Sequence, residues 1–294
     1  MNLRDLEYLV AVDEEGHFNR AAERCFVSQP TLSGQIKKLE EQLGVQLIER
    51  STRRVVMTDV GRAVAAQARR VLSASRGIRE IAQSFHDPMA GDLQVGLIPT
   101  LAPYLLPQIM PMLREQYPRL KLWLHEQQTA VLMERLRNAE LDLLILALPV
   151  PAHEFVEVDL FREPFWLAVP GMDPLARRKQ ASLADLHGRE LMLLEEGHCL
   201  REHALDVCLS AGVSKHNAFQ ATSLETLRHM VGEGMGSTLI PQLAVPEKRD
   251  GEVAYLPFKA PVPSRRIGML YRKGSYRAEA FATIGESISG CLAI

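Results

Sequence analysis

Four side chains with thiol or imidazole chemistry lie within one short segment: His198, Cys199, His203 and Cys208. A cysteine thiolate reacts with peroxide to form a sulfenic acid, and a second cysteine converts that acid into a disulfide. Two cysteines and two histidines are also zinc ligands, but this spacing is not that of familiar zinc modules. Free cysteines are commonly small buried hydrophobes. The residue types alone therefore leave three interpretations open: a redox pair, a metal site and an inert pair.

Helical periodicity separates the two cysteines. Small and apolar residues repeat at helical spacing through this segment, and Cys208 is one of them, so we expect it to face the core. Gly197 precedes the predicted helix, which puts Cys199 at or beside the helix N-terminus. There the helix dipole, a protonated His198 and Arg201 favour the thiolate form of Cys199.

The spacing also limits what a disulfide between these cysteines requires. On an intact helix, nine residues place the two Cα atoms roughly 13 Å apart. A disulfide needs a Cα separation of about 4.4–6.8 Å. A Cys199–Cys208 bond would therefore require local unwinding, and oxidation would itself change the conformation of the segment.

The segment belongs to a region, residues 91–294, in which strands and helices alternate. The predicted strands are 93–97, 120–125, 143–147, 166–169, 190–194, 218–221, 237–240 and 267–271. The predicted helices are 101–117, 130–139, 201–211, 224–233 and 276–290. Such alternation favours parallel α/β sheets, and the length suits two of them with a cleft between. Ligands of open α/β sheets bind beyond the carboxyl ends of the strands.

Residues 59–87 are predicted to form one long helix, with Thr58 as its N-cap. Mostly apolar residues repeat along it every 3.5 residues on average, as in a coiled coil. They are Val60, Val64, Gln67, Val71, Ala74, Ile78, Ile81 and Phe85. We expect a linker that dimerises with a second copy; the alternative is a helix that packs only on its own domain.

Residues 1–58 carry the strongest local motif. Two short helices are predicted around the turn at Val27 and Ser28, and the second has an apolar stripe and a polar, basic outer face. This arrangement is typical of a DNA-binding helix-turn-helix. Hydroxyl and amide groups read base edges, and basic groups bind phosphates, including those of a following wing. The candidate DNA-binding residues are Gln29, Pro30, Thr31, Ser33, Gln35, Lys37, Arg50 and Arg53.

Composition bounds the remaining choices. The chain has 294 residues, of which 47% are hydrophobic and 24% charged, with a net charge of −2. Residues 16–58 nevertheless hold seven basic and four acidic residues, which favours an anion as partner of this part. No apolar run is long enough to cross a bilayer, and no secretory signal is recognisable. With four cysteines the chain is not a disulfide-rich secreted scaffold, so we expect a cytoplasmic protein without a membrane partner.

The motif from Leu3 to Gly61 resembles the LysR-type transcriptional regulators. The similarity includes Ala21-Ala22, the run from Ser28 to Ser33, Leu43-Gly44, Arg50 and Thr58, whereas Ile48 replaces a phenylalanine usual in that family. The resemblance implies an N-terminal all-α winged helix-turn-helix with a long linker helix. It further implies a two-lobed α/β domain like the periplasmic binding proteins, and a homodimer that assembles into a tetramer on double-stranded DNA.

The regulatory region is similar to the peroxide-sensing members of the same family. The similar stretches are 96–100, 126–129, 194–201, Cys208 and 221–228. The resemblance implies that Cys199 reacts with hydrogen peroxide and that Cys208 resolves the product as a disulfide. It also implies that Thr100, Thr129 and His198 place the peroxide. Arg201 and Arg266 are candidates for tuning the charge there, although solvated surface arginines fit the sequence equally well.

Three functions compete on these grounds. The leading expectation is a non-enzymatic transcriptional activator of oxidative-stress genes, switched by hydrogen peroxide, without a cofactor or metal and with RNA polymerase as a further candidate partner. The second is a regulator of the same family that binds an ordinary small metabolite. The third is an enzyme, a thiol peroxidase or an α/β hydrolase. The hydrolase is disfavoured because Gly234-Met235-Gly236-Ser237-Thr238 is not the nucleophile motif G-x-S-x-G.

Overall fold

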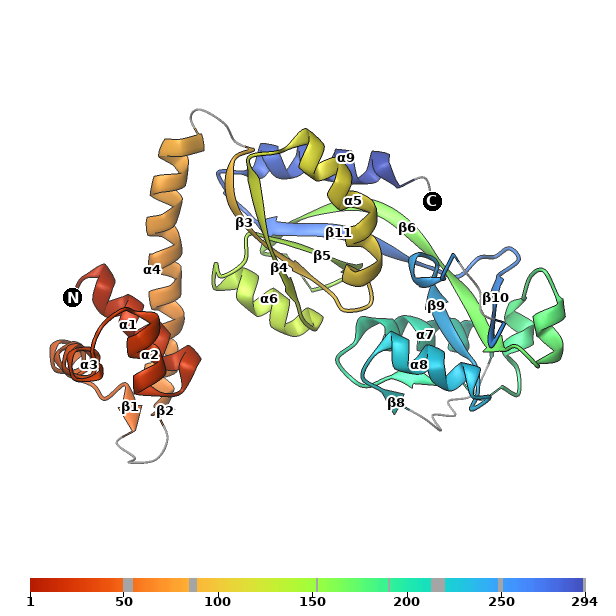
Figure 1. Cartoon of the computed structure of the whole chain (residues 1–294), viewed down its shortest axis with the longest axis horizontal. Coiled ribbons are helices and arrows are strands. Elements are labelled where there is room, and N and C mark those ends of the chain that lie inside the picture. Colours follow the sequence, from red (N-terminus) through yellow and green to blue (C-terminus); the bar gives the residue numbers. More distant parts are fainter. Residues whose placement is uncertain are drawn as a thin grey trace. The chain divides into compact units, whose positions relative to one another are not determined.

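The computed structural model describes residues 1–49, 55–84, 89–151, 153–189, 191–212, 220–247 and 251–292 (Figure 1). The chain divides into two compact units. One comprises Met1–Pro88 with Arg135–Glu140, and the other comprises Met89–Glu134 with Leu141–Ile294. Among the described residues, no helix combines the length and apolar character needed to span a membrane.

The N-terminal unit is a helix-turn-helix with a small hairpin. Its elements are α1 (Leu3–Glu15), α2 (Phe18–Arg24), α3 (Gln29–Leu43), β1 (Ile48–Glu49), β2 (Val56–Met57) and α4 (Asp59–Ser84). Leu9, Leu32 and Leu39 are fully buried at the centre of its core. Ser28 caps α3 by accepting a hydrogen bond from the Thr31 amide, and Gly44 ends the helix in a left-handed conformation. The predicted turn and cap are therefore confirmed.

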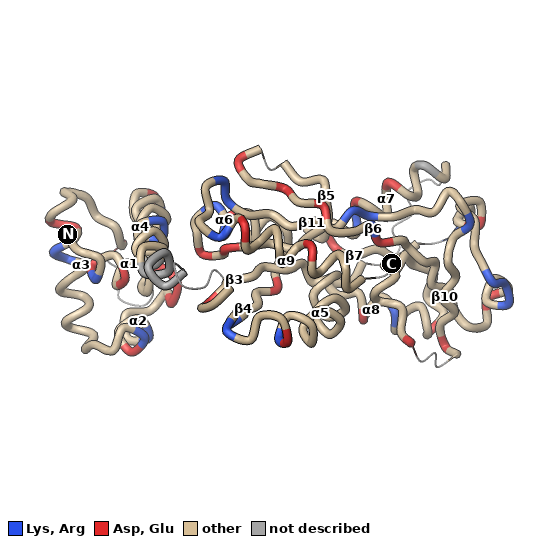
Figure 2. The backbone as a smooth tube through the Cα atoms, turned by 90° about the horizontal axis from the view of Figure 1, so that it is seen from above, with Lys and Arg blue, Asp and Glu red and all other residues tan. Residues whose placement is uncertain are grey.

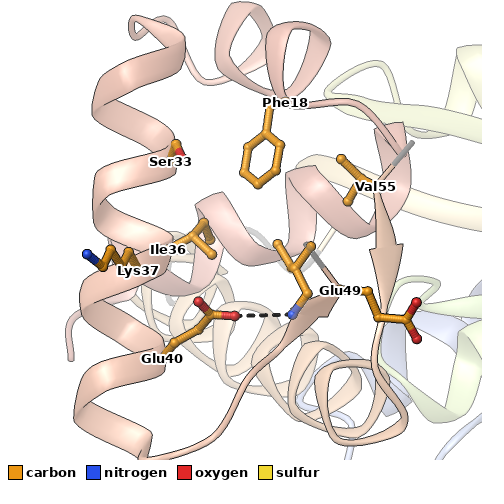
Figure 3. A pocket seen from close by; sticks show the side chains of 8 residues that line it. Phe18, Ser33, Ile36, Lys37, Glu40, Glu49 and Val55 are labelled. Carbon is orange, nitrogen blue, oxygen red and sulfur yellow. Dashed lines mark hydrogen bonds between the residues drawn. The ribbon is translucent and has the colours of Figure 1, made fainter. Parts of the chain in front are cut away.

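A partly buried carboxylate attaches the hairpin to α3. Glu40 Oε1 accepts hydrogen bonds from the Leu47 amide at 2.8 Å and from the Ile48 amide at 3.2 Å. Figure 3 shows Glu40 beside a cavity of about 270 Å³, into which Phe18, Ile36 and Val55 project. The cavity lies beneath the helix that the sequence identifies as the DNA-reading one.

Helix α4 presents two apolar stripes. One stripe, with Ala65 and Ala68, is buried against α1. The other contains the predicted coiled-coil positions, where Val60, Val71 and Ile78 are exposed by 48%, 39% and 70%. The side chain of Ile81 and the whole of Phe85 lie outside the described residues. Thr58 caps α4 as predicted, since its Oγ1 accepts from the Gly61 amide at 2.9 Å.

The C-terminal unit contains a seven-stranded mixed sheet of order β10-β6-β11-β5-β3-β4, with β9 also paired to β6. The strands are β3 (Gly91–Leu97), β4 (Leu120–Glu126), β5 (Leu143–Leu148), β6 (Phe155–Pro170), β9 (Thr238–Pro241), β10 (Val253–Pro257) and β11 (Ser264–Arg272). Helices α5 (Ala102–Gln116) and α9 (Ala278–Cys291) cover one face of its first half, and α6 (Thr129–Arg137) covers the other (Figure 1).

The prediction of parallel sheets is only partly right. Strand β3 pairs in parallel with β4 and β5, but β11 runs antiparallel to β5 and to β6. The 16-residue β6 was predicted only at 166–169, and β10 was not predicted. The stretch of β6 from residue 155 to 164 pairs with β11, whereas the stretch from 165 to 170 pairs with β9 and β10. One long strand therefore runs through both halves of the domain.

The second half of this domain has its own apolar core and carries the cysteine segment. Its elements include α7 (Cys199–Ser210), α8 (Leu224–Gly232) and the short parallel pair β7 (Leu193–Leu194) and β8 (Gln220–Ala221). Three short 3-10 turns, η1 (Pro174–Arg177), η2 (Leu183–Leu186) and η3 (Gln242–Ala244), complete it. Cys208 belongs to this core, together with Leu200 and Ala204.

Candidate redox site and DNA-binding surface

Both cysteines of the predicted redox pair lie on the intact helix α7, and both are free thiols. Cys199 is the first residue of the helix and is partly buried, whereas Cys208 is 5% exposed within the core. The expectation that Cys208 faces the core is confirmed. The nine-residue separation on a regular helix corresponds to ~13 Å along the axis, beyond the reach of a disulfide.

The Cys199 thiol is surrounded mainly by protein. Burial raises its pKa, and the nearby Glu202 carboxylate acts in the same direction. The Arg265 guanidinium, the Thr129 hydroxyl and the Leu200 amide oppose that rise without cancelling it. The expected effect of the helix N-terminus is present, because the Leu200 amide lowers the pKa of Cys199, but the net pKa is nevertheless raised. Desolvation exceeds the effect of the dipole because the thiol is largely removed from water.

Arg265 is the centre of a buried polar network. Its Nε donates to Glu163 Oε2 at 2.8 Å, and its other two nitrogens donate to Thr100 Oγ1 and to the Thr100 carbonyl, each at 2.9 Å. The side chains of Arg265 and Glu163 are both fully buried. They are directly opposite each other on the antiparallel strands β11 and β6. This ion pair fixes the position of Arg265, which holds the Thr100 hydroxyl and acts on the pKa of Cys199.

The two arginines named from the sequence lie elsewhere. Arg266 points to the other side of β11, where it is 37% exposed and binds Asp159 and Glu157. Arg201 donates to the Leu194 carbonyl at 2.9 Å. Arg265, the neighbour of Arg266 in β11, lowers the pKa of Cys199 through its positive charge. The alternation of side chains along a strand explains the difference, because adjacent residues face opposite sides.

Thr100 and Thr129 follow two adjacent parallel strands at the carboxyl edge of the sheet. Thr100 is 3% exposed and follows β3, while Thr129 begins α6 directly after β4. The Thr129 hydroxyl oxygen is buried and meets the geometry of a hydrogen bond with no partner among the described residues. It nevertheless lies close enough to the Cys199 sulfur to favour the thiolate. A buried hydroxyl with unused hydrogen-bonding capacity beside a thiol is suited to a small polar ligand.

Two imidazoles flank Cys199. His198 is 8% exposed, and its Nε2 lies 3.9 Å from the Glu195 carboxylate. His203, which the sequence suggested only as a zinc ligand, lies four residues after Cys199 on α7. Burial, and then the charge of Arg265, lower the pKa of His203. The described part of the chain contains no group of three or more histidine, cysteine or acidic side chains placed to hold a metal.

The segment before Cys199 packs closely on the first half of the domain. Gly197 has a φ of +93°, and a Cβ built on it would lie 2.6 Å from Oε1 of Gln128. Glycine is required there both by the left-handed backbone and by the close approach of Gln128. The other two cysteines lie apart from this site: Cys25 packs beside the N-terminal core, and Cys291 is exposed.

Most of the predicted DNA-binding residues lie on α3. Gln29, Pro30, Thr31 and Lys37 are exposed, and Ser33 and Gln35 are partly buried. Figure 2 shows basic residues along α3 in blue. Lys37 lies 3.9 Å from Glu41, a contact across solvent-exposed side chains that leaves its charge available for phosphates. Arg50 and Arg53 lie outside the described residues.

Comparison with known proteins gives consistent matches over nearly the whole chain. Residues 3–62 match the family described as bacterial regulatory helix-turn-helix protein, lysR family, and residues 86–289 match the LysR substrate binding domain. The chain is 50% identical to the DNA-binding transcriptional dual regulator OxyR of Escherichia coli, covering 98% of this chain and 95% of the relative. It is 49% identical to the hydrogen peroxide-inducible genes activator of Dickeya chrysanthemi, with the same coverage of both. The solved structure of full-length OxyR from Pseudomonas aeruginosa has a TM-score of 0.80 and 40% identity, covering 98% of this chain and 94% of that one.

Proposed function

Because this chain belongs to the LysR family of bacterial helix-turn-helix regulators, we propose that it is a transcriptional regulator switched by hydrogen peroxide through a reversible Cys199–Cys208 disulfide. One observation carries the proposal: the two thiols lie at opposite ends of one regular helix, one in a polar buried site and the other in the apolar core. The relatives' names support hydrogen peroxide as the signal.

The chemistry has two steps. The Cys199 sulfur attacks one peroxide oxygen, the O–O bond breaks, water leaves, and Cys199 carries a sulfenic acid. The Cys208 thiol then attacks the Cys199 sulfur, and a second water leaves as the disulfide forms. Because the cysteines are too far apart on the helix, the second step requires α7 to unwind. Reduction of the disulfide by cellular thiols reverses the change.

The polar groups around Cys199 provide the peroxide site in this proposal. The hydroxyls of Thr100 and Thr129 and the imidazole of His198 supply hydrogen bonds to the two peroxide oxygens. In this proposal Arg265 takes the charge-tuning role expected of Arg201 and Arg266, since its positive charge favours the Cys199 thiolate. The site stabilises the developing negative charge on the departing oxygen.

The rest of the molecule transmits the change to DNA. We infer that residues 1–58 bind double-stranded DNA, that the helix at 59–87 forms a homodimer, and that dimers assemble into a tetramer. We further infer that residues 91–294 form a two-lobed domain like the periplasmic binding proteins and sense peroxide in the cytoplasm. Unwinding of α7 changes the surface available for assembly, which alters contacts with oxidative-stress promoters and RNA polymerase. No steady-state turnover of peroxide is needed for this role.

The first test is Cys199→Ser. The substitution removes the nucleophilic thiol, so one equivalent of hydrogen peroxide should no longer produce a Cys199–Cys208 linkage or change the DNA footprint. Intact mass and peptide mapping should show a loss of two hydrogens per chain in the parent and none in the variant. Cys291→Ser, which changes an exposed cysteine remote from α7, should respond as the parent does. An unchanged footprint response in Cys199→Ser would contradict the proposal and favour a non-covalently bound effector.

A further inference from the structure

The buried Cys199 thiol poses a problem for its own reactivity. Thiolate, not thiol, attacks peroxide, yet burial raises the pKa of Cys199 and keeps the proton on sulfur at neutral pH. A nearby base is therefore needed to receive that proton as the sulfur attacks. The two imidazoles closest in sequence are His198, which lies near the Glu195 carboxylate, and His203.

His203 has the position of such a base and, in the part of the chain that the structure describes, a ring nitrogen without a hydrogen-bond partner. It lies four residues after Cys199 on α7, so both side chains project from the same face of the helix, with Cβ atoms ~5–6 Å apart. Its Nδ1 is buried and has no hydrogen-bond partner among the described residues. The lone pair on this nitrogen is therefore not engaged by a protein donor among the described residues and is available to accept a proton.

The surroundings of His203 keep its ring neutral. Arg265 on β11 repels a second positive charge, while Asp206 and Glu202 on α7 and the Leu148 carbonyl on β5 favour the charged form. Burial and Arg265 prevail, so the pKa of His203 lies below its usual value and the imidazole is free to accept a proton at neutral pH. Arg265 thus acts on both partners, since it also favours the Cys199 thiolate.

We infer that His203 is the proton acceptor for Cys199 in the reaction with hydrogen peroxide. The S–H proton moves to the imidazole as the sulfur attacks one oxygen of the peroxide. The O–O bond breaks, and the departing oxygen takes a proton from the imidazolium and leaves as water. Cys199 is oxidised by two electrons to S–OH, the peroxide is reduced, and His203 returns to its neutral form. This inference rests on the proposed function.

The test is the pH dependence of thiol oxidation in the Cys208→Ser background, which stops the reaction at the sulfenic acid. Rates of Cys199 oxidation by hydrogen peroxide are measured from pH 5 to 9 by quenched flow and mass spectrometry. With a neutral base present, the oxidation rate should not change with pH between the pKa of His203 and that of Cys199. At pH values below the pKa of His203, the rate should decrease. His203→Gln should lower the rate at pH 7 by on the order of 10²-fold. It should also replace the level region by a rate that rises tenfold per pH unit with thiolate content.

Controls separate the inference from its alternatives. His229→Gln removes an exposed imidazole on α8 and should reproduce the parent rate and profile. The result that would overturn the inference is a level region that survives in His203→Gln, or that disappears in His198→Gln alone. His203→Asn is a second variant; of the two His203 variants, the one whose unfolding midpoint matches that of the parent is used. A parent rate profile with no level region would by itself contradict the inference. If Cys199 of the parent does not react at all, the proposed function fails as well.

Discussion

At the residue scale, the site depends on one buried ion pair. Arg265 and Glu163 are paired across adjacent strands with no exposed side-chain surface, and Arg265 also holds both oxygens of Thr100. Glu163 Oε1 further accepts from the Leu243 amide at 3.0 Å. Removing one member of a buried pair leaves an uncompensated charge, which costs far more than losing an exposed pair.

Glu163→Gln is therefore expected to lower the free energy of unfolding by about 3 kcal/mol and to slow oxidation of Cys199 through loosening of Thr100. Asp159→Asn is the matched control, because it removes a partner of the exposed neighbour Arg266. That variant should leave both quantities unchanged. Urea unfolding and thiol-loss kinetics measure the two effects. Equal responses of the two variants would show that the buried pair has no special role.

A second consequence at this scale concerns pH and stability. The pKa of His203 is lowered in the folded chain, so the unfolded chain binds the proton more readily. The sign follows from linkage: stability contributed by neutral His203 is present above its unfolded pKa of ~6.5 and falls as pH drops below that value. Urea unfolding between pH 5 and 7.5 should show this loss in the parent and a smaller loss in His203→Gln. The same loss in both would contradict the assignment.

At the element scale, close backbone approaches fix how α4 begins. A Cβ on Gly61 would lie 2.0 Å from the Leu47 carbonyl oxygen, a backbone atom that cannot move aside easily. Thr58 reinforces the same contact, because its Oγ1 donates to the Gln46 carbonyl at 2.8 Å. The start of the long helix is thus locked to the segment that leads into the hairpin.

Two glycine substitutions should consequently have opposite signs. Gly61→Ala is expected to destabilise the N-terminal unit, despite the ~1 kcal/mol that alanine gains over glycine within a helix. Gly34→Ala should be stabilising by about that amount, since a Cβ at Gly34 meets no atom within 4 Å. Thermal unfolding of the full chain would measure both. A stabilising Gly61→Ala would mean that the helix start can shift.

At the scale of the whole molecule, assembly depends on a surface that one chain leaves uncovered. The coiled-coil positions Val60, Val71 and Ile78 are exposed, while the opposite stripe of α4 is already buried against α1. An exposed apolar stripe with heptad spacing favours pairing with a second copy of the same helix. The proposal of a homodimer rests on this arrangement.

Val71→Asp is expected to weaken the dimer by at least ~10-fold in its dissociation constant, which corresponds to ~1.4 kcal/mol. Burying a carboxylate in the seam causes the loss. Ser73→Asp introduces the same charge on a side of α4 away from the seam and should leave the dimer intact. Sedimentation velocity over a range of concentrations reports the assembly. If Val71→Asp remains as dimeric as the parent, the dimer must form through another surface.

Local patterns in the sequence were sufficient to predict several features of the structure. The turn before α3, the Ser28 and Thr58 caps, the burial of Cys208 and the strands β3, β4 and β5 follow from capping chemistry and from the 3.6- and 2-residue periods. The distance argument against a disulfide on an intact α7 needed only helix geometry. All of these depend on residues close to one another in the chain.

Long-range contacts decided the rest. The sequence could not show that β11 runs antiparallel between β5 and β6, because register and direction are set by distant partners. That register buries Arg265 opposite Glu163 and turns Arg266 to the solvent-facing side, which adjacent positions in a sequence do not reveal. The tertiary structure also determines the pKa of Cys199. Burial of the thiol raises this pKa by more than the helix N-terminus, which is visible in the sequence, lowers it.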